Sequence, residues 1–205
     1  MVNSIAIFGG SFNPIHNMHI NIALDVKNTF DFDQIELMPC HIPVHKKSIA
    51  SSYDRVAMLK LAIRNYNSLK INTLEIERGG PSYMIDTLLA IKESTGKVVY
   101  LIIGSDSLNN FHKWKEWQKI LANCNLIIAP RIGSEIRIAN DIRNKITNSI
   151  SEIKKQSSGL IYIMPKIYKN TSSSEERQNI YNKYKKNDLD KLVAEYISTN
   201  RMYSK

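Results

Sequence analysis

Short apolar runs rich in β-branched residues alternate with helical periodicity along most of the chain. The runs span residues 4–8, 34–38, 71–77, 98–103, 125–129 and 160–164. Each run is short and bounded by turn residues, which is typical of buried strands. Apolar residues with a 3.6-residue period fill intervals at residues 56–66, 85–92, 138–153 and 189–197. This alternation predicts βαβ units, and therefore an α/β fold with a doubly wound parallel sheet.

The length of the chain indicates how many such units belong together. A chain of 205 residues suits one globular domain, so we expect a single domain over residues 1–205. Its last part, about residues 171–205, is expected to form a small C-terminal helical part. Apolar residues make up 43% of the chain and charged residues 23%, which excludes a disordered chain.

The charge of the chain is positive and uneven. Lys and Arg number 28 against 19 Asp and Glu, which gives a formal charge of +9. Residues 135–205 hold 14 basic and 8 acidic residues, and so carry +6 of that charge. A basic surface favours anions, whether nucleotides, phosphates, nucleic acid or acidic membrane, and does not choose among them.

The cysteines and the N-terminus indicate the compartment. Cys40 and Cys124 are isolated, without CxxC spacing, which is typical of a reducing compartment. The N-terminal residues are too short and too weakly basic for a signal peptide. No apolar run approaches the roughly 20 residues that span a bilayer. We therefore expect a cytoplasmic protein without a membrane partner.

Open parallel sheets bind ligands at the carboxyl ends of their strands, so the loop after the first run is the first candidate site. It begins with Gly9, Gly10, Ser11 and Phe12. A helical pattern follows, and His16 and His19 at its start project to the same side. Free N–H groups at a helix start together with two imidazoles favour phosphate. A surface turn with incidental histidines is the alternative, and we expect no metal site because His-x-x-His offers only two ligands.

Two further loops carry residues of interest. Residues 38–47 end a predicted strand and deliver Lys46, a mobile point charge suited to polyphosphate. Residues 78–88 form a turn followed by a helix, where Ser82 is expected to cap the helix and Tyr83 either packs in the core or lines the site. A solvated surface loop is the ordinary alternative for Lys46.

The fourth run ends in Gly104 and Asp106. A carboxylate here can accept hydrogen bonds from ribose hydroxyls, or it caps the next short helix. Trp114 and Trp117 follow, three residues apart, and are expected on one helical face. Two such tryptophans often belong to a core, but a tryptophan can also stack on a flat aromatic ligand.

The last candidate segment follows the run at residues 160–164. Ser172 and Ser173 are expected to open a helix that carries Arg177 in its first turn. Hydroxyls, free N–H groups and a guanidinium together suit polyphosphate, although an ordinary N-cap run has the same residues. The charge of Glu176 is expected to leave this turn more exposed.

These segments resemble a known family. Residues 9–19 are similar to the G-x-F-x-P-x-H-x-G-H signature of nucleotidyltransferases with the HIGH-type motif, with Met18 in place of its last glycine. Residues 38–47 and 78–88 resemble the P-x-x-P-P-H-K and R-x-G-x-S-Y-T-x-D-T-L segments of nicotinate-nucleotide adenylyltransferases, with Met84 in place of the threonine. The tryptophan pair and an I-S-S-T-x-I-R-like stretch that ends at Arg177 complete five segments in the family's order.

The resemblance implies a Rossmann-like sheet of the nucleotidylyl transferase type. It also implies transfer of AMP from ATP to nicotinate mononucleotide, giving deamido-NAD and pyrophosphate, with Mg²⁺ held by phosphate oxygens and no protein ligand named. The catalytic residues that it implies are His16, His19, Lys46 and Arg177. ATP is expected at Gly9, Gly10, Ser11, Phe12, His16, His19, Gly104, Asp106, Ser172, Ser173 and Arg177. Nicotinate mononucleotide is expected at Lys46, Ser82, Tyr83, Met84 and Trp114.

Other functions stay open at this point. An enzyme that prefers nicotinamide mononucleotide would share almost every segment. A phosphopantetheine adenylyltransferase would share the first motif but lacks the segments around Ser82 and Trp114. The basic C-terminal third could also bind RNA, but its tyrosines form no recognisable RNA-binding motif, so no nucleic-acid partner is expected. The sequence also leaves open whether the chain forms a homo-oligomer.

Overall fold

The computed structural model describes residues 3–44, 50–182 and 187–204. Within these residues one parallel sheet has the strand order β3-β2-β1-β4-β5-β7-β6. The strands are β1 (Ser4–Gly10), β2 (Ile35–Pro39), β3 (Leu69–Ile71), β4 (Val98–Gly104), β5 (Asn125–Ala129), β6 (Ile146–Thr147) and β7 (Ile161–Ile163). The order reverses between β1 and β4, which places a crevice at their carboxyl ends.

Helices cover both faces of this sheet. They are α1 (Asn17–Phe30), α2 (Ser52–Ile63), α3 (Leu74–Arg78), α4 (Met84–Thr95), α5 (Ser105–Asn109), α6 (Trp117–Asn123), α7 (Ile150–Lys155), α8 (Ser173–Asn179) and α9 (Lys191–Thr199). Two 3₁₀ turns, η1 (Phe111–Lys113) and η2 (Asn140–Lys145), complete the regular structure. None of the helices in the described residues is long and apolar enough to cross a membrane.

The two faces of β4 belong to two separate cores. Tyr100 and Ile102 pack with residues of α1, α2 and α9 on one side of the sheet. Val99, Leu101 and Ile103 pack with residues of α4 and α6 on the other side. Because successive strand residues point to opposite faces, a strand that is apolar at every position requires helices on both sides. The predicted doubly wound α/β fold is therefore confirmed.

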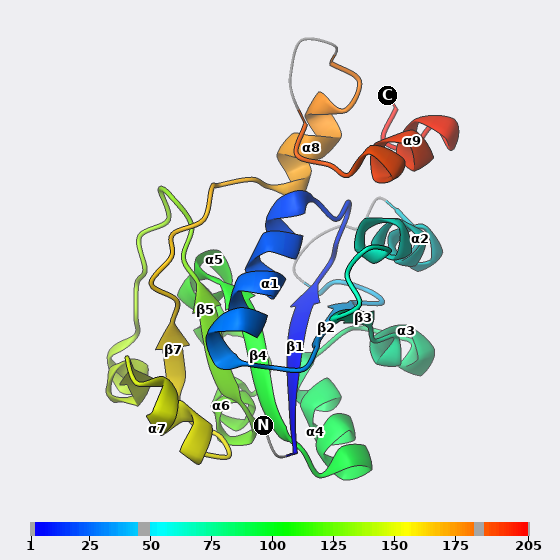
Figure 1. Ribbon diagram of the computed structural model, residues 1–205. Helices are drawn as coiled ribbons and strands as arrows, with labels where there is room; N and C mark the ends of the chain where they lie inside the picture. Colours follow the sequence, from blue (N-terminus) through cyan, green and yellow to red (C-terminus); the bar gives the residue numbers. More distant parts are fainter. Residues whose placement is uncertain (1–2, 45–49, 183–186, 205) are drawn as a thin grey trace.

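The carboxyl ends of the strands face the C-terminal helices (Figure 1). Helix α8 lies beyond these ends and α9 lies beside α2, whereas the N-terminus lies at the opposite end of the sheet. Arg64 Nη1 lies 2.9 Å from Asp190 Oδ1, and the Tyr196 hydroxyl donates to Asp54 Oδ1 at 3.0 Å. These contacts fasten the C-terminal part to α2. The single domain expected from the sequence stays a prediction.

The predicted strand at residues 71–77 is wrong in most of its length. Strand β3 ends at Ile71, and α3 begins at Leu74. The Asn72 side chain accepts a hydrogen bond from the Leu74 N–H at 3.0 Å, which starts the helix. The buried carboxylate of Glu75 then accepts from the Thr87 hydroxyl at 2.6 Å. The local hydrogen bond from Leu74 to the Asn72 side chain and this buried polar contact outweigh the β-branched pattern.

The single helical stripe predicted at residues 138–153 is also wrong. The segment forms η2, then β6, then α7. The pair Ile146–Thr147 joins the edge of the sheet beside β7. Ser149 starts α7, because its hydroxyl accepts from the Glu152 N–H at 3.2 Å. The regular spacing of the isoleucines predicted one helix, although Thr147 and Ser149 mark its interruption.

The first core gives a stability prediction at Phe30, the last residue of α1. Its side chain is fully buried. The centroid of its ring lies 5.6 Å from the ring centroid of Phe32 and 5.2 Å from that of Tyr162. Removing a buried ring leaves a cavity, so Phe30→Ala should lower the free energy of unfolding by about 3–5 kcal/mol. Urea unfolding measures this loss. Tyr53→Ala, at an aromatic side chain 79% exposed, is the control and should cost under about 1 kcal/mol. A loss that small for Phe30→Ala would contradict the packing.

Candidate active site

The loop between β1 and α1 passes close to two side chains. A Cβ atom on Gly9 would lie 3.2 Å from Met84 Cε, and one on Gly10 would lie 3.2 Å from the Phe12 ring. Phe12 itself has a φ of 45° and is buried. Its ring lies edge-on to that of His19, with 5.1 Å between the centroids. The glycines therefore allow the backbone to fold tightly around an aromatic side chain that supports the second histidine.

The two histidines lie together, as the sequence predicts. Their ring centroids are 3.7 Å apart, and the ring planes are inclined by 34°. The His16 backbone N–H donates to His19 Nδ1 at 3.3 Å. His16 precedes the first residue of α1, and both side chains are at least nine-tenths buried. The imidazole pair is thus fixed at the start of the helix.

The His16 side chain is uncharged near neutral pH. Burial, together with the positive charge of Arg131, lowers the pKa of His16 from 6.5 to about 3. Its Nδ1 atom is buried and has no hydrogen-bond partner among the described residues. A neutral imidazole can donate or accept a hydrogen bond but supplies no charge, so positive charge for an anionic ligand must come from other side chains.

Arg131 is one such side chain, and it is not among the site residues predicted from the sequence. Its Nη1 atom lies 3.3 Å from Asp106 Oδ2, and a Cβ on Gly104 would lie 3.5 Å from its Nε. That Nε is buried without a partner among the described residues. Arg131 comes two residues after β5 ends. Reading the carboxyl end of every predicted strand would have found it.

Asp106 lies in the first turn of α5, whose N-cap is Gly104. The alternative that Asp106 caps this helix is therefore wrong. Its carboxylate also accepts from the Ser134 hydroxyl at 2.9 Å. The side chain is 59% exposed, so its oxygens remain accessible to a ligand.

Arg55 of α2 connects two of the loops, and this residue too was missed. It is 1% exposed. Nη1 donates to the backbone oxygens of Ser11 at 3.0 Å and Cys40 at 2.7 Å, and Nη2 donates to that of His41 at 3.0 Å. The loops after β1 and β2 are therefore held by one guanidinium. The helical pattern of residues 56–66 gave no signal for this contact.

Lys46 lies outside the described residues, and the described part of its loop is anchored by Ser82. The His41 N–H donates to Ser82 Oγ at 2.8 Å, and the Ser82 N–H donates to the Ile42 oxygen at 3.0 Å. Tyr83 occupies the N-cap of α4 and makes no side-chain cap. The predicted capping role of Ser82 is therefore wrong, because its hydroxyl accepts from the neighbouring loop instead.

The residues predicted around the pyridine ring lie at the margin of the second core. Tyr83, Met84 and Trp114 are each half-buried against it. Lys115 Nζ lies 4.6 Å from the Tyr83 ring centroid. Trp114 directly follows η1, whereas Trp117 begins α6. The expected shared helical face is therefore wrong, because Glu116 between them has a φ of 51° and interrupts the helix.

Helix α8 is joined to the first loop. Ser172 is its N-cap, and its hydroxyl accepts from the Glu175 N–H at 3.2 Å. The Ser173 hydroxyl donates to the Pro14 oxygen at 2.9 Å, and Arg177 Nη1 donates to the Asn13 oxygen at 2.6 Å. The structure thus brings Ser173 and Arg177 of α8 to the loop that leads into His16.

Comparison with known proteins gives a consistent result. The family model described as Cytidylyltransferase-like matches residues 7–188. A protein of Legionella pneumophila (strain Lens) named "Probable nicotinate-nucleotide adenylyltransferase" is 37% identical over 98% of this chain and 100% of its own length. A relative of the same name from Vesicomyosocius okutanii is 37% identical over 83% of this chain and 81% of its own. The chain belongs to the nicotinate-nucleotide adenylyltransferase family.

Solved structures share the fold. The nicotinic acid mononucleotide adenylyltransferase of Plasmodium falciparum, complexed with APC, has a TM-score of 0.76 and 23% identity. The comparison covers 98% of this chain and 97% of that one. A Vibrio parahaemolyticus structure described as a putative nicotinate-nucleotide adenylyltransferase has a TM-score of 0.65 at 16% identity. The Rossmann-like sheet of the nucleotidylyl transferase type is therefore confirmed.

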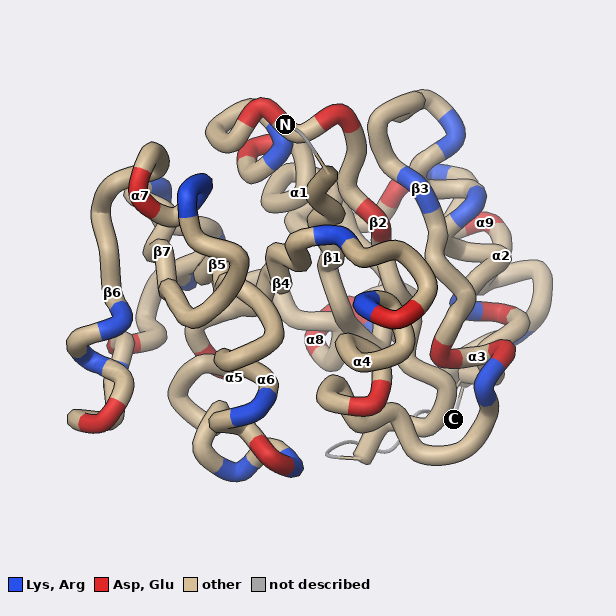
Figure 2. The backbone as a smooth tube through the Cα atoms, turned by 90° about the horizontal axis from the view of Figure 1, so that it is seen from below, with Lys and Arg blue, Asp and Glu red and all other residues tan. Residues whose placement is uncertain are grey.

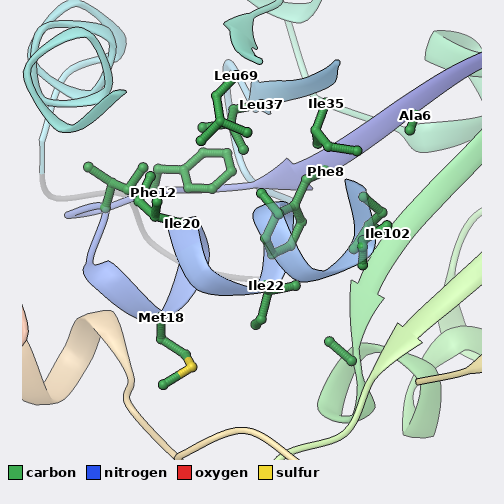
Figure 3. Close-up of a cluster of buried hydrophobic side chains, with 14 of the residues drawn as sticks. Ala6, Phe8, Phe12, Met18, Ile20, Ile22, Ile35, Leu37, Leu69 and Ile102 are labelled. Carbon is green, nitrogen blue, oxygen red and sulfur yellow. The ribbon is translucent and has the colours of Figure 1, made fainter. Parts of the chain in front are cut away.

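Met18 replaces a glycine of the adenylyltransferase signature, and the structure places its side chain in the core. It is 7% exposed and belongs to the first core cluster. Figure 3 shows Met18 pointing away from Phe8 and Phe12, on the other side of α1. The larger Met18 side chain packs in the first core, and the two histidine rings still lie together.

Glu176 replaces an isoleucine of the family's serine-rich segment, and its expected exposure is wrong. It is 5% exposed, and Oε2 accepts from the Asp188 N–H at 3.0 Å. The Asp188 oxygen in turn accepts from the Asn17 N–H at 2.8 Å. Burial raises the pKa of Glu176. The Asn17 N–H at the start of α1, which the sequence suggests is free for phosphate, is therefore occupied by the C-terminal part.

Adenylyltransferases of this fold use a divalent metal with ATP. The described residues contain no group of three or more His, Cys, Asp or Glu side chains that could hold a metal ion. The donors that gather at the candidate site are hydroxyls, guanidinium groups and imidazoles. Such donors suit the phosphates of a metal–nucleotide complex better than the metal itself.

The buried neutral His16 gives a pH prediction. The unfolded chain binds a proton on this group below pH 6.5, but the native chain does so only near pH 3. Native stability that is complete above pH 6.5 is therefore lost as the pH falls toward 3, by about 2 kcal/mol at pH 5. Urea unfolding at pH 7.5 and 5.0 should show that extra loss in the wild type relative to His16→Gln.

Contributions of other groups, such as Glu176, are common to both proteins and cancel in this comparison. The control is His112→Gln, at an exposed histidine, which should follow the wild type at both pH values. Equal pH dependence of the wild type and His16→Gln would contradict a neutral buried imidazole.

Proposed function

We propose that this chain transfers the adenylyl group of ATP to nicotinate mononucleotide, releasing deamido-NAD and pyrophosphate. The observation that carries the proposal is the direct contact between α8 and the first loop. Through Ser173 and Arg177, the two segments that resemble phosphate-binding motifs form one surface. This surface lies at the carboxyl ends of the strands, where sheets of this class bind ligands.

The chemistry requires the protein to hold two anions together. A phosphate oxygen of the mononucleotide attacks the α-phosphorus of ATP, and pyrophosphate leaves without a covalent protein intermediate. The protein contributes position and charge stabilisation. We assign hydrogen bonding to the ATP phosphates to His16 and His19. We assign neutralisation of the leaving pyrophosphate to Arg177 and to Lys46, which lies outside the described residues.

The remaining residues of the site divide between the two substrates. On the ATP side, we propose that the tight turn at Gly9, Gly10, Ser11 and Phe12 admits the nucleotide, with Ser172 and Ser173 beside its phosphates. Gly104 lets Arg131 approach, and Asp106 accepts from a ribose hydroxyl. On the mononucleotide side, Ser82, Tyr83 and Met84 border the pyridine ring, and Trp114 stacks on it.

We propose Mg²⁺ as the divalent metal, because it binds phosphate oxygens and keeps several of its waters. It would enter with ATP and screen the triphosphate, and no protein ligand is assigned to it. The cytoplasm is the proposed location, since Cys40 and Cys124 are both free thiols.

An enzyme for nicotinamide mononucleotide is the second candidate, and Met84 favours it. The methionine packs over Gly9 and offers no hydroxyl at the ring, so recognition of a carboxylate would rest on backbone N–H groups at the start of α4. RNA binding fits less well. Figure 2 shows Lys and Arg interspersed with Asp and Glu rather than gathered in a stripe.

Pyrophosphate release tests the reaction directly. The purified protein, with ATP and Mg²⁺, would be given nicotinate mononucleotide, nicotinamide mononucleotide or phosphopantetheine in parallel. We expect kcat/KM to be at least about tenfold higher for nicotinate mononucleotide than for the amide, a difference of about 1.4 kcal/mol in transition-state binding. Preference for the amide would move the specificity to the second candidate, and no release with any acceptor would refute adenylyl transfer.

Arg177 gives a second prediction. Arg177→Ala removes a guanidinium from the proposed polyphosphate site, so kcat/KM for ATP should fall at least about tenfold. Arg177→Lys keeps the charge but not the paired donors, and it should recover part of this loss. The exposed Arg143→Ala is the matched control and should leave kcat/KM unchanged. Unchanged turnover in a folded Arg177→Ala protein would remove Arg177 from the site.

A further inference from the structure

Asn13 is a junction between the first loop and the C-terminal part. It is 3% exposed. Its backbone oxygen accepts from Arg177 Nη1 at 2.6 Å, and its side-chain Oδ1 accepts from the Tyr203 hydroxyl at 2.6 Å. One residue of the loop is therefore held at two atoms by two different C-terminal side chains. The loop reaches His16 three residues later.

Tyr203 is suited to a permanent donor role. Its ring packs at the margin of the first core cluster, in the last described turn of the chain. Burial raises the pKa of its phenol, which therefore keeps its proton in ordinary buffers. The charges of Arg177, Asp54 and Arg55 also act on this phenol. A protonated phenol can donate to Asn13 at neutral pH.

Other contacts also hold the C-terminal tail. The Tyr181 hydroxyl donates to the Met202 oxygen at 2.7 Å, and the Met202 N–H donates to the Ile197 oxygen at 3.0 Å. Met202 and Tyr203 also pack on the core. Packing and these contacts hold the tail. The Tyr203 hydroxyl, for its part, donates its hydrogen bond to Asn13.

We propose that Tyr203 is a positioning residue for adenylyl transfer. Its hydroxyl fixes the Asn13 side chain, and with it the backbone oxygen that receives Arg177 and the turn that leads into His16. Tyr203 touches no substrate in this proposal, which rests on the function proposed above. Neither Asn13 nor Tyr203 belongs to the residues that the family resemblance singled out.

Tyr203→Phe tests the proposal, because it removes one hydroxyl and keeps the ring. We expect kcat to fall about fivefold, the equivalent of one hydrogen bond, with KM for nicotinate mononucleotide within about twofold of wild type. The matched control is Tyr196→Phe, which removes a phenol that donates to Asp54. It should leave kcat within about 1.5-fold of wild type.

A cycle with Asn13→Ala separates positioning from a general loss of structure. If the two residues act through one contact, the double variant should lose no more kcat than the more impaired single variant. Multiplied losses, an unchanged kcat in Tyr203→Phe, or an equal loss in Tyr196→Phe would overturn the proposal.

Hydrogen exchange tests the same contact without turnover. In Tyr203→Phe, the amides of residues 11–19 should exchange faster than in the wild type, whereas those of α4 should not change. Unchanged exchange at residues 11–19 would overturn the positioning role even if the enzyme is active. A wild type that is inactive with every acceptor would refute the proposed function, and the exchange result would still decide the contact.

Discussion

The loop after β1 depends on hydrogen-bond donors from distant parts of the chain. A buried backbone oxygen without a donor is costly, and this loop has no regular structure of its own to supply one. Arg55 donates to Ser11, Ser173 to Pro14 and Arg177 to Asn13. These donors come from α2 and α8, so the position of the histidine-bearing loop is decided by helices that follow it in sequence.

This arrangement also leaves the site positively charged. Arg55 and Arg177 donate to neutral backbone oxygens, and neither has a carboxylate within ion-pair distance among the described residues. In the part of the chain that the structure describes, the carboxylate that pairs with Arg131 is the exposed Asp106. The neighbouring His16 is kept neutral by burial and by the Arg131 guanidinium. Fixed positive groups with few internal counter-charges favour an anion, and they need little rearrangement when it binds.

The fold was predictable from the sequence because a buried parallel strand has a strong local pattern. The runs that became β1, β2, β4 and β5 needed no tertiary information. The errors at β3 and at residues 138–153 arose where the side chains of Asn72 and Ser149 accept hydrogen bonds from backbone N–H groups two or three residues later. The candidate site segments could be predicted because they follow strands. Arg55 and Asn13 could not, since their roles depend on long-range contacts with backbone oxygens.

The C-terminal part completes the site rather than merely following it. The Asp188 oxygen occupies the first N–H of α1, and the buried Glu176 fixes the Asp188 backbone. Tyr203 reaches Asn13 across 190 residues of sequence. Because the first loop obtains its donors from the end of the chain, the surroundings of the histidine pair depend on contacts with α8 and the tail. The candidate site is thereby built from both ends of the chain, and its geometry depends on how they pack together.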